Sequence, residues 1–310
     1  MSFTESVLIC DQVDAILGNI LQKHGLKVSY EPQVTPDDLA KKIGNYEIII
    51  VRSRTKITKD LIENASKCKI IARVGVGLDN IDTEAAKAKN IRVINAVEGA
   101  MNAVAELVIS LMLSLAREIP RADREIRAGN WIKKELMGTE LAGKYLGIVG
   151  LGNIGKRLGR LARALNMNVI GYDVVPIDQE FAKDVGLIKA DLDTLLQSAD
   201  YVSLHVPLLD STKHMINAER LAKMKKTAKI INTSRGGTID EDALYDAIKS
   251  GNLGGAALDV FEKEPATGNK LATLPNVICT PHIGAQTSEA QSLAANVIAE
   301  KVIQILRGVI

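Results

Sequence analysis

The segment from Tyr145 to Tyr172 constrains the fold more than any other part of the sequence. An apolar run typical of a buried strand leads into Gly150-Leu151-Gly152-Asn153-Ile154-Gly155, and a helical pattern and a second apolar run follow. Glycines at this spacing suit a tight turn, a close approach of the backbone to a phosphate group, and close packing of helix on strand. The amino end of the helix would attract the phosphates. The segment therefore predicts a dinucleotide-binding βαβ unit.

An acidic residue ends the second strand of this unit. Asp173 follows Tyr172, about twenty residues after the glycines, where a carboxylate accepts hydrogen bonds from the adenosine ribose hydroxyls. Its charge would repel a 2′-phosphate, and no arginine follows in Asp173-Val174-Val175. We therefore expect NAD rather than NADP as the cofactor. A βα turn that binds no ligand is the alternative, because a glycine motif by itself is weak.

The overall composition excludes several classes of function. A length of 310 residues suggests two domains, and the net charge of +2 comes from scattered Lys and Arg, which argues against nucleic-acid or membrane binding. Cys10, Cys68 and Cys279 match no metal-ligand spacing, so we expect reduced thiols in the cytoplasm and no metal. The sequence shows no signal-peptide pattern, and its longest apolar stretch, 107–116, is too short to cross a membrane.

Short apolar runs alternate with helical patterns in two series. The first series has strand candidates at Ser6–Ile9, Lys27–Tyr30, Ile48–Val51, Ile70–Arg73 and Arg92–Ile94. The second has candidates at Tyr145–Val149, Asn168–Tyr172, Tyr201–Leu204, Lys229–Asn232, Gly254–Leu258 and Val277–Cys279. This alternation predicts an α/β protein with two doubly wound, Rossmann-like parallel-sheet domains and a cleft between them.

Two longer helices are expected outside these series. One runs from about Asn102 to Arg117, with Asn102 as its N-cap and Pro120 after its end. The segment 121–140 that follows has a mixed pattern and contains the only tryptophan, Trp131. The other long helix, 287–306, ends the chain.

Three residues offer the chemistry that oxidation of a 2-hydroxy acid requires. Arg235 follows Lys229–Asn232, and its planar guanidinium suits a carboxylate, while the glycines behind it let the backbone turn close to a ligand. His282 is a candidate acid/base, and Glu264, if bonded to it, would stabilise the imidazolium. Each residue alone more commonly has a structural or surface role. Their positions after strands, where open α/β sheets bind ligands, favour the functional interpretation.

These residues belong to an ordered set of motifs that spans almost the whole chain. The motifs are VRSRTK at Val51, RVGVGLDNID at Arg73, VAELV at Val104, NWIKKELMGTEL at Asn130, LGIVGLGNIG at Leu146, NTSRGG at Asn232, AALDVFEKEP at Ala256 and TPHIGAQTSEAQ at Thr280. The set resembles the D-isomer-specific 2-hydroxyacid dehydrogenase family. Coverage from end to end makes the resemblance specific.

The resemblance implies a role for each matching residue. His282 would be the acid/base, Glu264 its partner, Arg235 the carboxylate anchor, and Asp259 the residue that holds the nicotinamide carboxamide. The residues implied to bind the cofactor are Gly150, Gly152, Asn153, Ile154, Gly155, Tyr172, Asp173, His205, Val206, Pro207, Thr212, Thr233, Ser234, Arg235, Asp259, His282 and Gly284. Those implied to bind the substrate are Arg52, Ser53, Gly75, Val76, Gly77 and, from a partner subunit, Lys133. The carry-over to Lys133 is the least secure, because the surrounding segment varies.

The family fold also implies a domain arrangement. A discontinuous substrate-binding domain would comprise residues 1–99 and 287–310, and an NAD-binding domain residues 100–286, with a dimerisation segment at 102–140. We therefore expect a homodimer. Longer members of one branch carry a C-terminal regulatory domain, and because this sequence stops soon after its last helix we expect a short form without it.

The residues leave two alternatives open. The basic residues Arg52 and Lys133 favour a small phosphorylated 2-hydroxy acid, but a sister enzyme such as a glyoxylate or hydroxypyruvate reductase would share the other motifs. An NAD-sensing binding protein on the same fold is an alternative of another class, because fold alone does not determine function.

Overall fold

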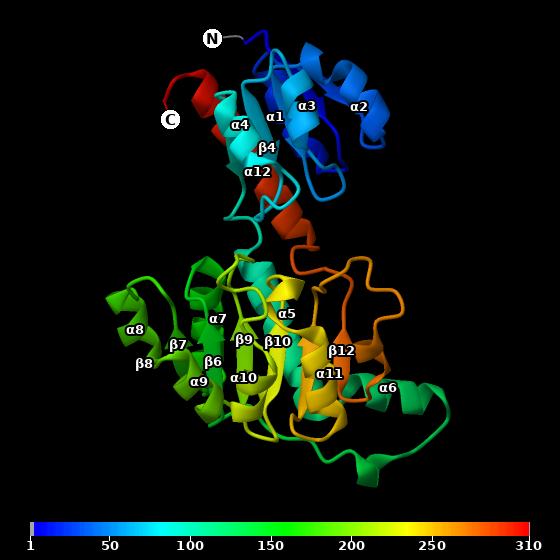
Figure 1. Cartoon of the computed structure of the whole chain (residues 1–310), viewed down its shortest axis with the longest axis vertical. Helices are drawn as coiled ribbons and strands as arrows, with labels where there is room; N and C mark the ends of the chain where they lie inside the picture. The colour runs from blue at the N-terminus through cyan, green and yellow to red at the C-terminus, as the bar shows by residue number, and fades with distance from the viewer. Residues whose placement is uncertain (1–2, 310) are drawn as a thin grey trace. The chain divides into compact units, whose positions relative to one another are not determined.

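Parallel strands form two separate sheets in the structure, a computed structural model that describes residues 3–309. Contacts divide the chain into two compact units. The first comprises the residues up to Met101 and those from Ala285 onward, and the second comprises Asn102–Gly284. Helices cover both faces of each sheet (Figure 1), so the predicted doubly wound α/β fold class is confirmed.

The first unit contains a five-stranded sheet in the order β2-β1-β3-β4-β5. Its strands are β1 (Ser6–Ile9), β2 (Lys27–Tyr30), β3 (Ile48–Val51), β4 (Ile70–Arg73) and β5 (Arg92–Asn95). Its helices are α1 (Ala15–Lys23), α2 (Pro36–Lys42), η1 (Ile43–Asn45), α3 (Lys59–Asn64), α4 (Thr83–Ala88) and α12 (Ser288–Leu306). The predicted strand bounds are confirmed, apart from one further residue at the end of β5.

Alternate strand residues of this unit face two hydrophobic cores. Val7 and Ile9 of β1 pack with α1 and α12 on one face, whereas Leu8 packs with α2, α3 and α4 on the other. Helix α12 lies beside α1 and buries Ile298 and Val302 in the first of these cores. Because both faces of the sheet are covered, its three inner strands β1, β3 and β4 are mostly apolar and buried, which made them recognisable in the sequence.

The second unit contains a seven-stranded sheet in the order β12-β11-β10-β9-β6-β7-β8. Its strands are β6 (Tyr145–Val149), β7 (Asn168–Tyr172), β8 (Ile188–Lys189), β9 (Tyr201–Leu204), β10 (Lys229–Asn232), β11 (Gly255–Leu258) and β12 (Val277–Cys279). Successive strands run outward in both directions from β6 and β9. The boundary between these two strands is the switch point, where such sheets bind ligands.

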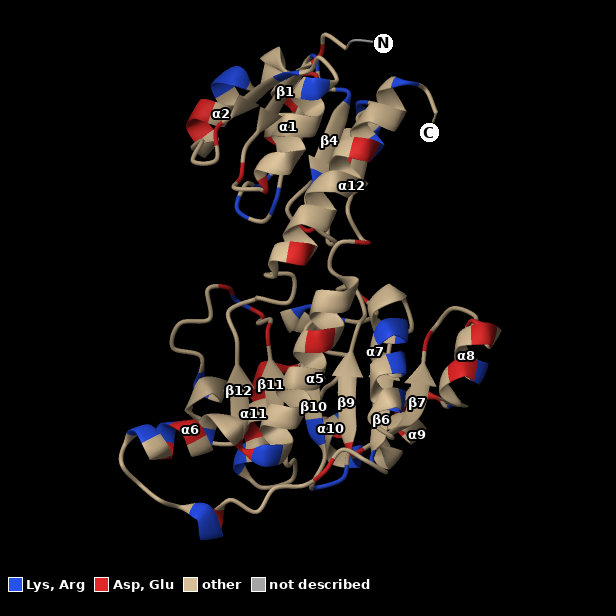
Figure 2. Ribbon diagram, turned by 180° about the vertical axis from the view of Figure 1, so that it is seen from behind, with Lys and Arg blue, Asp and Glu red and all other residues tan. Residues whose placement is uncertain are grey.

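Helices again divide between two cores in the second unit. Leu146 and Ile148 of β6 pack with α5 (Met101–Arg117), α7 (Asn153–Ala164) and α8 (Gln179–Val185). Val149 packs with α9 (Leu192–Ser198), α10 (Ala218–Lys223) and α11 (Glu241–Lys249) on the opposite face. The remaining elements are α6 (Ile119–Arg127), η2 (Lys133–Glu135), η3 (Gly236–Thr238) and η4 (Lys270–Thr273). The few charged residues of the strands lie at strand ends (Figure 2).

Near the long helix the predicted N-cap is wrong, whereas Pro120 follows the end of the helix at Arg117 as predicted. Helix α5 already includes Met101, so Asn102 lies within it and is not its N-cap. Pro120 lies in the first turn of α6, a position that tolerates proline because the N–H it lacks would have no intrahelical partner. The left-handed residue Glu118, with φ of 50°, separates the two helices. None of the helices within residues 3–309 combines the length and apolar character needed to cross a membrane.

Candidate active site

Six strands of the second unit end along one edge of its sheet, because all of them are parallel. The predicted site residues follow these ends, in the spatial order Asp173 after β7, Gly150 after β6, His205 after β9, Arg235 after β10, Asp259 after β11 and His282 after β12. Neighbouring strands lie about 4.8 Å apart, so five spacings place the predicted cofactor and catalytic residues in a row of about 24 Å.

Two of the three loop glycines are required by the protein itself. Gly150 has a φ of +95°, and a Cβ atom there would lie 2.6 Å from the carbonyl oxygen of His205. A Cβ atom on Gly155 would lie 2.1 Å from the carbonyl oxygen of Gly150. These contacts agree with the predicted tight turn and close helix–strand packing.

Gly152 has no such internal reason to be glycine. Its φ of −69° suits any residue, and a Cβ atom there would meet nothing within 4 Å. It is also the N-cap of α7, and among the described residues no side chain caps this helix. The first N–H groups of α7 lack intrahelical partners, and the space in front of them is open. This open, uncapped helix end fits the pyrophosphate of a dinucleotide.

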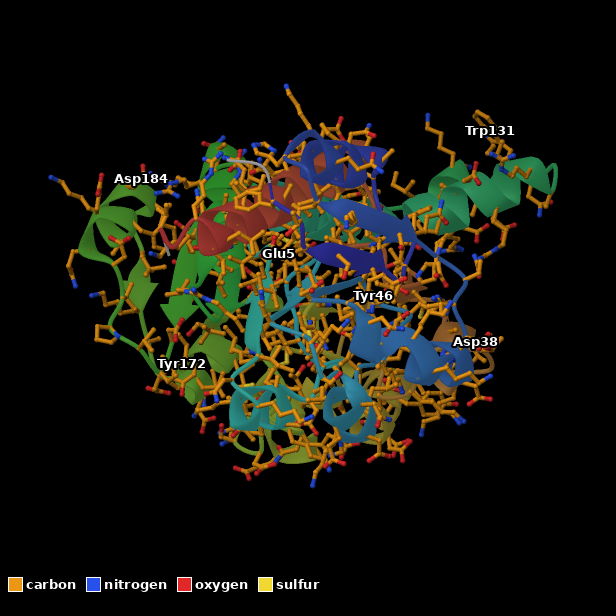
Figure 3. All side chains as sticks on the ribbon, turned by 90° about the horizontal axis from the view of Figure 1, so that it is seen from above. Glu5, Asp38, Tyr46, Trp131, Tyr172 and Asp184 are labelled. Carbon is orange, nitrogen blue, oxygen red and sulfur yellow. The ribbon has the colours of Figure 1, made fainter. Side chains whose placement is uncertain are left out.

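Asp173 connects the second strand to the glycine loop. Its Oδ2 accepts a hydrogen bond from the Leu151 N–H at 2.6 Å, and its Oδ1 accepts one from the Val175 N–H at 3.1 Å. Each carboxylate oxygen keeps a second lone pair, so the side chain can still accept hydrogen bonds from two ribose hydroxyls. Tyr172, labelled in Figure 3, pairs with Val149 of β6.

His205 packs against the glycine loop, since its carbonyl oxygen is the atom that a Cβ on Gly150 would meet. Its N–H donates to the carbonyl oxygen of Val149 at 2.7 Å, and its Nε2 lies 2.9 Å from the Ser203 hydroxyl. Burial lowers the pKa of this imidazole to about 4, because it penalises the charged form. The ring is therefore neutral at physiological pH. The predicted contact of His205 with the cofactor stays a prediction, and a neutral ring would bring no charge to it.

Two predicted cofactor residues differ in what their hydroxyls do. The Thr212 hydroxyl closes a turn by donating to the Pro207 carbonyl at 2.6 Å and accepting from the Leu209 N–H at 2.8 Å. The Oγ1 atom of Thr233, after β10, is buried and has no hydrogen-bond partner within the described part of the chain. A buried hydroxyl without a partner is costly, which fits a site that a ligand completes.

The histidine and its predicted partner are in contact. His282 Nδ1 lies 2.8 Å from Glu264 Oε2, and Glu264 Oε1 accepts a hydrogen bond from the Phe261 N–H at 3.2 Å. A carboxylate only accepts, so Nδ1 carries the hydrogen and Nε2 is the free nitrogen. The His282 side chain is 52% exposed, which leaves Nε2 accessible to a ligand.

Asp259 has a structural function that sequence reasoning missed. It is fully buried, and its Oδ1 accepts hydrogen bonds from the Thr280 hydroxyl at 2.6 Å and the Ile283 N–H at 2.8 Å. Its Oδ2 accepts one from the Gly284 N–H at 2.8 Å. These bonds hold the loop in which His282 adopts a left-handed φ of 54°. The predicted contact of Asp259 with the nicotinamide carboxamide stays a prediction.

Arg235 follows β10, two strands from His282 along the sheet edge. Its carbonyl accepts hydrogen bonds from Asn232 Nδ2 at 2.8 Å and the Thr238 hydroxyl at 2.7 Å, and its Nη1 donates to the Ser234 carbonyl at 2.7 Å. The prediction that the glycines behind Arg235 let the backbone turn close to a ligand stays a prediction, but Gly236 has a separate reason within the protein to be glycine. A Cβ atom there would lie 1.9 Å from the carbonyl carbon of Phe261, so the close approach is to the protein itself.

The predicted substrate residues of the first unit lie after β3 and β4. The Arg52 guanidinium donates to the side-chain oxygen of Gln286, and burial lowers the pKa of Arg52. Ser53 is exposed, and a Cβ atom on Gly75 would lie 2.9 Å from Arg73 Nη1. The Val76 carbonyl accepts a hydrogen bond from Asn95 Nδ2 at 2.5 Å. Gln286 was missed, because no chemical motif marks it.

The predicted partner-subunit contact lies in the second unit. Lys133 begins η2, and its side chain is exposed. Between α6 and β6 the chain forms an extended segment that lies away from the sheet (Figure 1). Trp131 is 81% exposed, and Figure 3 shows its ring projecting outward beyond α6. The segment thus presents a basic and a large apolar side chain to the surroundings.

Comparisons with known proteins agree with this geometry. The sequence model described as "D-isomer specific 2-hydroxyacid dehydrogenase, NAD binding domain" matches residues 109–284. The chain is 46% identical to D-3-phosphoglycerate dehydrogenase of Methanocaldococcus jannaschii over 97% of its length, but it spans only 57% of that relative. It is 47% identical to hydroxypyruvate reductase of Thermotoga maritima over 93% of both chains.

A solved structure agrees over the whole chain. D-lactate dehydrogenase of Aquifex aeolicus, solved with NAD and lactic acid, has a TM-score of 0.84 and 30% identity, covering 98% of this chain and 96% of its own. Together with the match over residues 109–284, the relative of equal length at 47% identity establishes the family. The chain belongs to the D-isomer specific 2-hydroxyacid dehydrogenase family, and its second unit contains that family's NAD-binding domain.

Proposed function

We propose that this chain is an NAD-dependent D-2-hydroxyacid dehydrogenase that oxidises 3-phosphoglycerate to 3-phosphohydroxypyruvate, the reaction of D-3-phosphoglycerate dehydrogenase in serine biosynthesis. The observation that carries the proposal is the contact of 2.8 Å between His282 Nδ1 and Glu264 Oε2, with an accessible Nε2 at the carboxyl edge of the NAD-binding sheet. An imidazole held this way is a general acid/base.

The protein's own side chains account for the transfer of the proton from the substrate hydroxyl. When bound, NAD supplies the acceptor for the hydride that leaves C2 of the substrate. His282 Nε2 takes the proton of the C2 hydroxyl, so that the carbon becomes a carbonyl, and Glu264 stabilises the resulting imidazolium. In the reverse direction the protonated imidazole returns the proton to the oxygen. The bonds from Asp259 keep the His282 loop in place throughout.

Arg235 is the proposed anchor for the substrate carboxylate. It follows the strand next to β11, and its carbonyl is fixed by Asn232 and Thr238, so its side chain starts from a rigid backbone. A guanidinium binds a carboxylate through two parallel hydrogen bonds. We further propose that Arg52 and Ser53 of the first unit, with Gly75–Gly77, bind the other end of the substrate.

Two kinds of relative favour two different substrates. The phosphoglycerate dehydrogenases are 46% identical in M. jannaschii and 44% in Synechocystis, each over at least 97% of this chain. The hydroxypyruvate reductase of T. maritima is equally similar and of similar length, which supports hydroxypyruvate as a second candidate. We favour the phosphorylated acid because cationic side chains at Arg52 and Lys133 suit a phosphate.

Steady-state kinetics distinguish the candidates. We expect kcat/KM for NADH-dependent reduction of 3-phosphohydroxypyruvate to exceed the values for hydroxypyruvate and glyoxylate by at least about tenfold, the effect of one extra charged hydrogen bond. Equal or higher values for the unphosphorylated acids would replace the proposed substrate with the second candidate. Arg52→Ala should remove the preference without abolishing turnover.

We also propose a homodimer formed through residues 102–140. Apolar side chains of this segment are exposed at Leu113 (42%), Ile119 (52%), Ile126 (56%), Trp131 (81%) and Met137 (86%). An exposed cluster of this kind marks an interaction surface. Light scattering should give twice the chain mass, and a monomer at every concentration would contradict the proposal. In such a dimer Lys133 would reach the partner's substrate.

The cysteines support a reducing compartment. Burial raises the pKa of Cys10 and Cys68 to about 12 and that of Cys279 to about 11, so all three free thiols are poor nucleophiles. We propose a cytoplasmic location, because all three cysteines are free thiols. The expectation that the protein binds no nucleic acid stays a prediction.

A further inference from the structure

Asp11 is a buried carboxylate at the carboxyl end of β1, with a side chain that is 2% exposed. Its Oδ2 accepts a hydrogen bond from the Arg52 N–H at 2.6 Å, and its Oδ1 accepts one from the Thr55 hydroxyl at 2.6 Å. The Thr55 N–H lies 3.2 Å from both oxygens. One side chain thus binds both ends of the four-residue loop that follows β3.

The carbonyl groups of the same loop are bound from the other side. Asn80 Nδ2 donates to the carbonyl oxygens of Arg52 at 3.1 Å and Thr55 at 2.7 Å, and Arg73 Nε donates to the Arg52 carbonyl at 3.0 Å. The backbone of Arg52 is therefore fixed through its N–H and its C=O group. A loop bound on both sides has one conformation, as a site that must meet a ligand requires.

The two arginines of the loop differ in their partners. Arg54 Nη2 lies 3.3 Å from Asp11 Oδ1 and donates to the Cys10 carbonyl at 2.5 Å, so this side chain is used within the fold. The half-buried Arg52 guanidinium donates a hydrogen bond to Gln286, a neutral amide. Gln286 fixes the direction of the Arg52 side chain and does not neutralise its charge, so the cation remains available for an anion.

A carboxylate suits this position better than an amide. It has only acceptor atoms, so both oxygens can face N–H and O–H donors. An asparagine would place an NH₂ group against one of these buried donors, and an unsatisfied buried donor is costly. Asp11 touches no atom of the proposed substrate, and its effect passes through the loop.

We propose that Asp11 is a positioning residue for substrate binding: it holds the Arg52–Thr55 loop in the conformation that presents Arg52 and Ser53 to the anionic end of the substrate. The inference rests on the proposed function, because it assumes that this loop contacts the substrate. It adds a specific chemical requirement, which is that the anion contact depends on a buried carboxylate on a neighbouring strand.

The test replaces Asp11 with Asn in the full-length protein and measures two quantities. Because the loop binds substrate and transition state alike, KM for 3-phosphoglycerate should rise about tenfold, the loss of one hydrogen bond to a charged group, while kcat and KM for NAD stay near their original values. Amide hydrogen exchange at Arg52 and Thr55 should become about tenfold faster, whereas exchange in β6 and β9 should not change.

Further variants keep the test decisive if Asp11→Asn folds poorly. Thr55→Val removes the hydroxyl that donates to Asp11 and keeps the shape of the side chain, so it should reproduce part of the rise in KM. Thr55→Ser keeps a hydroxyl and should therefore keep the original KM. Asp14→Asn is the matched control. It makes the same charge change three residues away at the N-cap of α1, without touching the loop, and should leave KM unchanged.

The outcomes separate this inference from the proposed function. Unchanged exchange at Arg52 and Thr55 would overturn the inference whatever the activity, because that measurement needs no substrate. Faster exchange with unchanged KM would show that the loop does not serve the substrate, and would also overturn it. If the unmodified protein oxidised no 2-hydroxy acid, the proposed function would have failed, and with it the role of Asp11 in substrate binding.

Discussion

The glycine loop after β6 and the loop that carries His282 lie at the same edge of one sheet but are fixed in different ways. In the glycine loop the backbone turns because Gly150 and Gly155 lack side chains, and the amide groups at the start of α7 stay open. In the His282 loop the amide groups of Ile283 and Gly284 are bound by the buried carboxylate of Asp259. The first loop offers its backbone to a ligand, and the second offers a side chain.

The Arg52–Thr55 loop of the first unit is fixed in the same way as the His282 loop, by a buried acid. Asp11 binds its amide groups as Asp259 binds those of the His282 loop, and each acid lies within two residues of the end of a neighbouring strand. Where the side chain is to act, a buried acid takes up the backbone donors and fixes the direction of that side chain. Where the backbone is to act, glycine shapes the turn, Asp173 binds only the Leu151 N–H of the loop, and no side chain caps the first amide groups of α7.

The largest expected effect comes from replacing His282, the side chain that the loop fixed by Asp259 presents. His282→Ala should lower kcat by roughly a hundredfold to ten-thousandfold, the usual contribution of a general acid/base, and leave NADH affinity near its original value. Steady-state kinetics and a fluorescence titration with NADH measure the two effects separately. Near-normal turnover would show that His282 does not transfer the proton.

Two glycine substitutions test the other type of loop. Gly155→Ala places a Cβ atom 2.1 Å from the Gly150 carbonyl oxygen and should lower the free energy of unfolding by about 3 kcal/mol, as overpacking does. Gly152→Ala meets no atom within 4 Å and should cost under about 1 kcal/mol, yet weaken NADH binding about tenfold. Urea unfolding measures the free energy of unfolding of both variants, and a titration with NADH measures their affinity for the cofactor. Normal NADH affinity in Gly152→Ala would contradict the role of the open backbone.

Asp259→Asn tests the buried acid of the His282 loop. The amide NH₂ would face one of the N–H or O–H donors now bound, so the free energy of unfolding should fall by about 1 to 3 kcal/mol. Because His282 would lose its fixed position, kcat should fall with it. Thr280→Val removes only one of the three donors and should show a smaller change in both quantities. A fully active, fully stable Asp259→Asn would break the proposed difference between the loops.

The last prediction concerns pH dependence and His205, which packs against the glycine loop and takes no part in the proposed chemistry. Its pKa is about 4 in the folded protein and 6.5 in the unfolded chain, so between these values the unfolded chain binds a proton that the folded chain does not. Stability therefore falls as the pH decreases through this window, by about 2 kcal/mol between pH 7 and pH 5. His205→Gln should lose this part of the pH dependence. An unchanged dependence in that variant would assign it to other groups.

The sequence was most informative where the chain itself carries the signal. Eleven strands were located within one residue, most of them because strands buried on both faces are apolar runs, whereas β8, with its two exposed residues, was missed. Helix α6 was also missed, because none of its side chains is buried and it has no core-facing stripe. The glycine loop came from a local motif, whereas the pairing of His282 with Glu264 was implied by the family resemblance.

The supporting contacts had no comparable signal. Asp11 and Asp259 act on residues 41 and 24 positions away in the sequence, at distances that only the parallel strands make short. A single sequence reveals the residue type but not which backbone donors it meets. Gly236 illustrates the same limit, because its close contact with the Phe261 backbone cannot be seen in the sequence.

Substrate-dependent formation of NADH tests the central claim most directly. The unmodified protein is mixed with NAD and 3-phosphoglycerate, and NADH is followed by its near-ultraviolet absorbance. NADH should form only when both compounds are present, and the rate should collapse in His282→Ala. If the protein binds NADH normally but forms none with 3-phosphoglycerate or any other 2-hydroxy acid, it is an NAD-binding protein and not the dehydrogenase proposed.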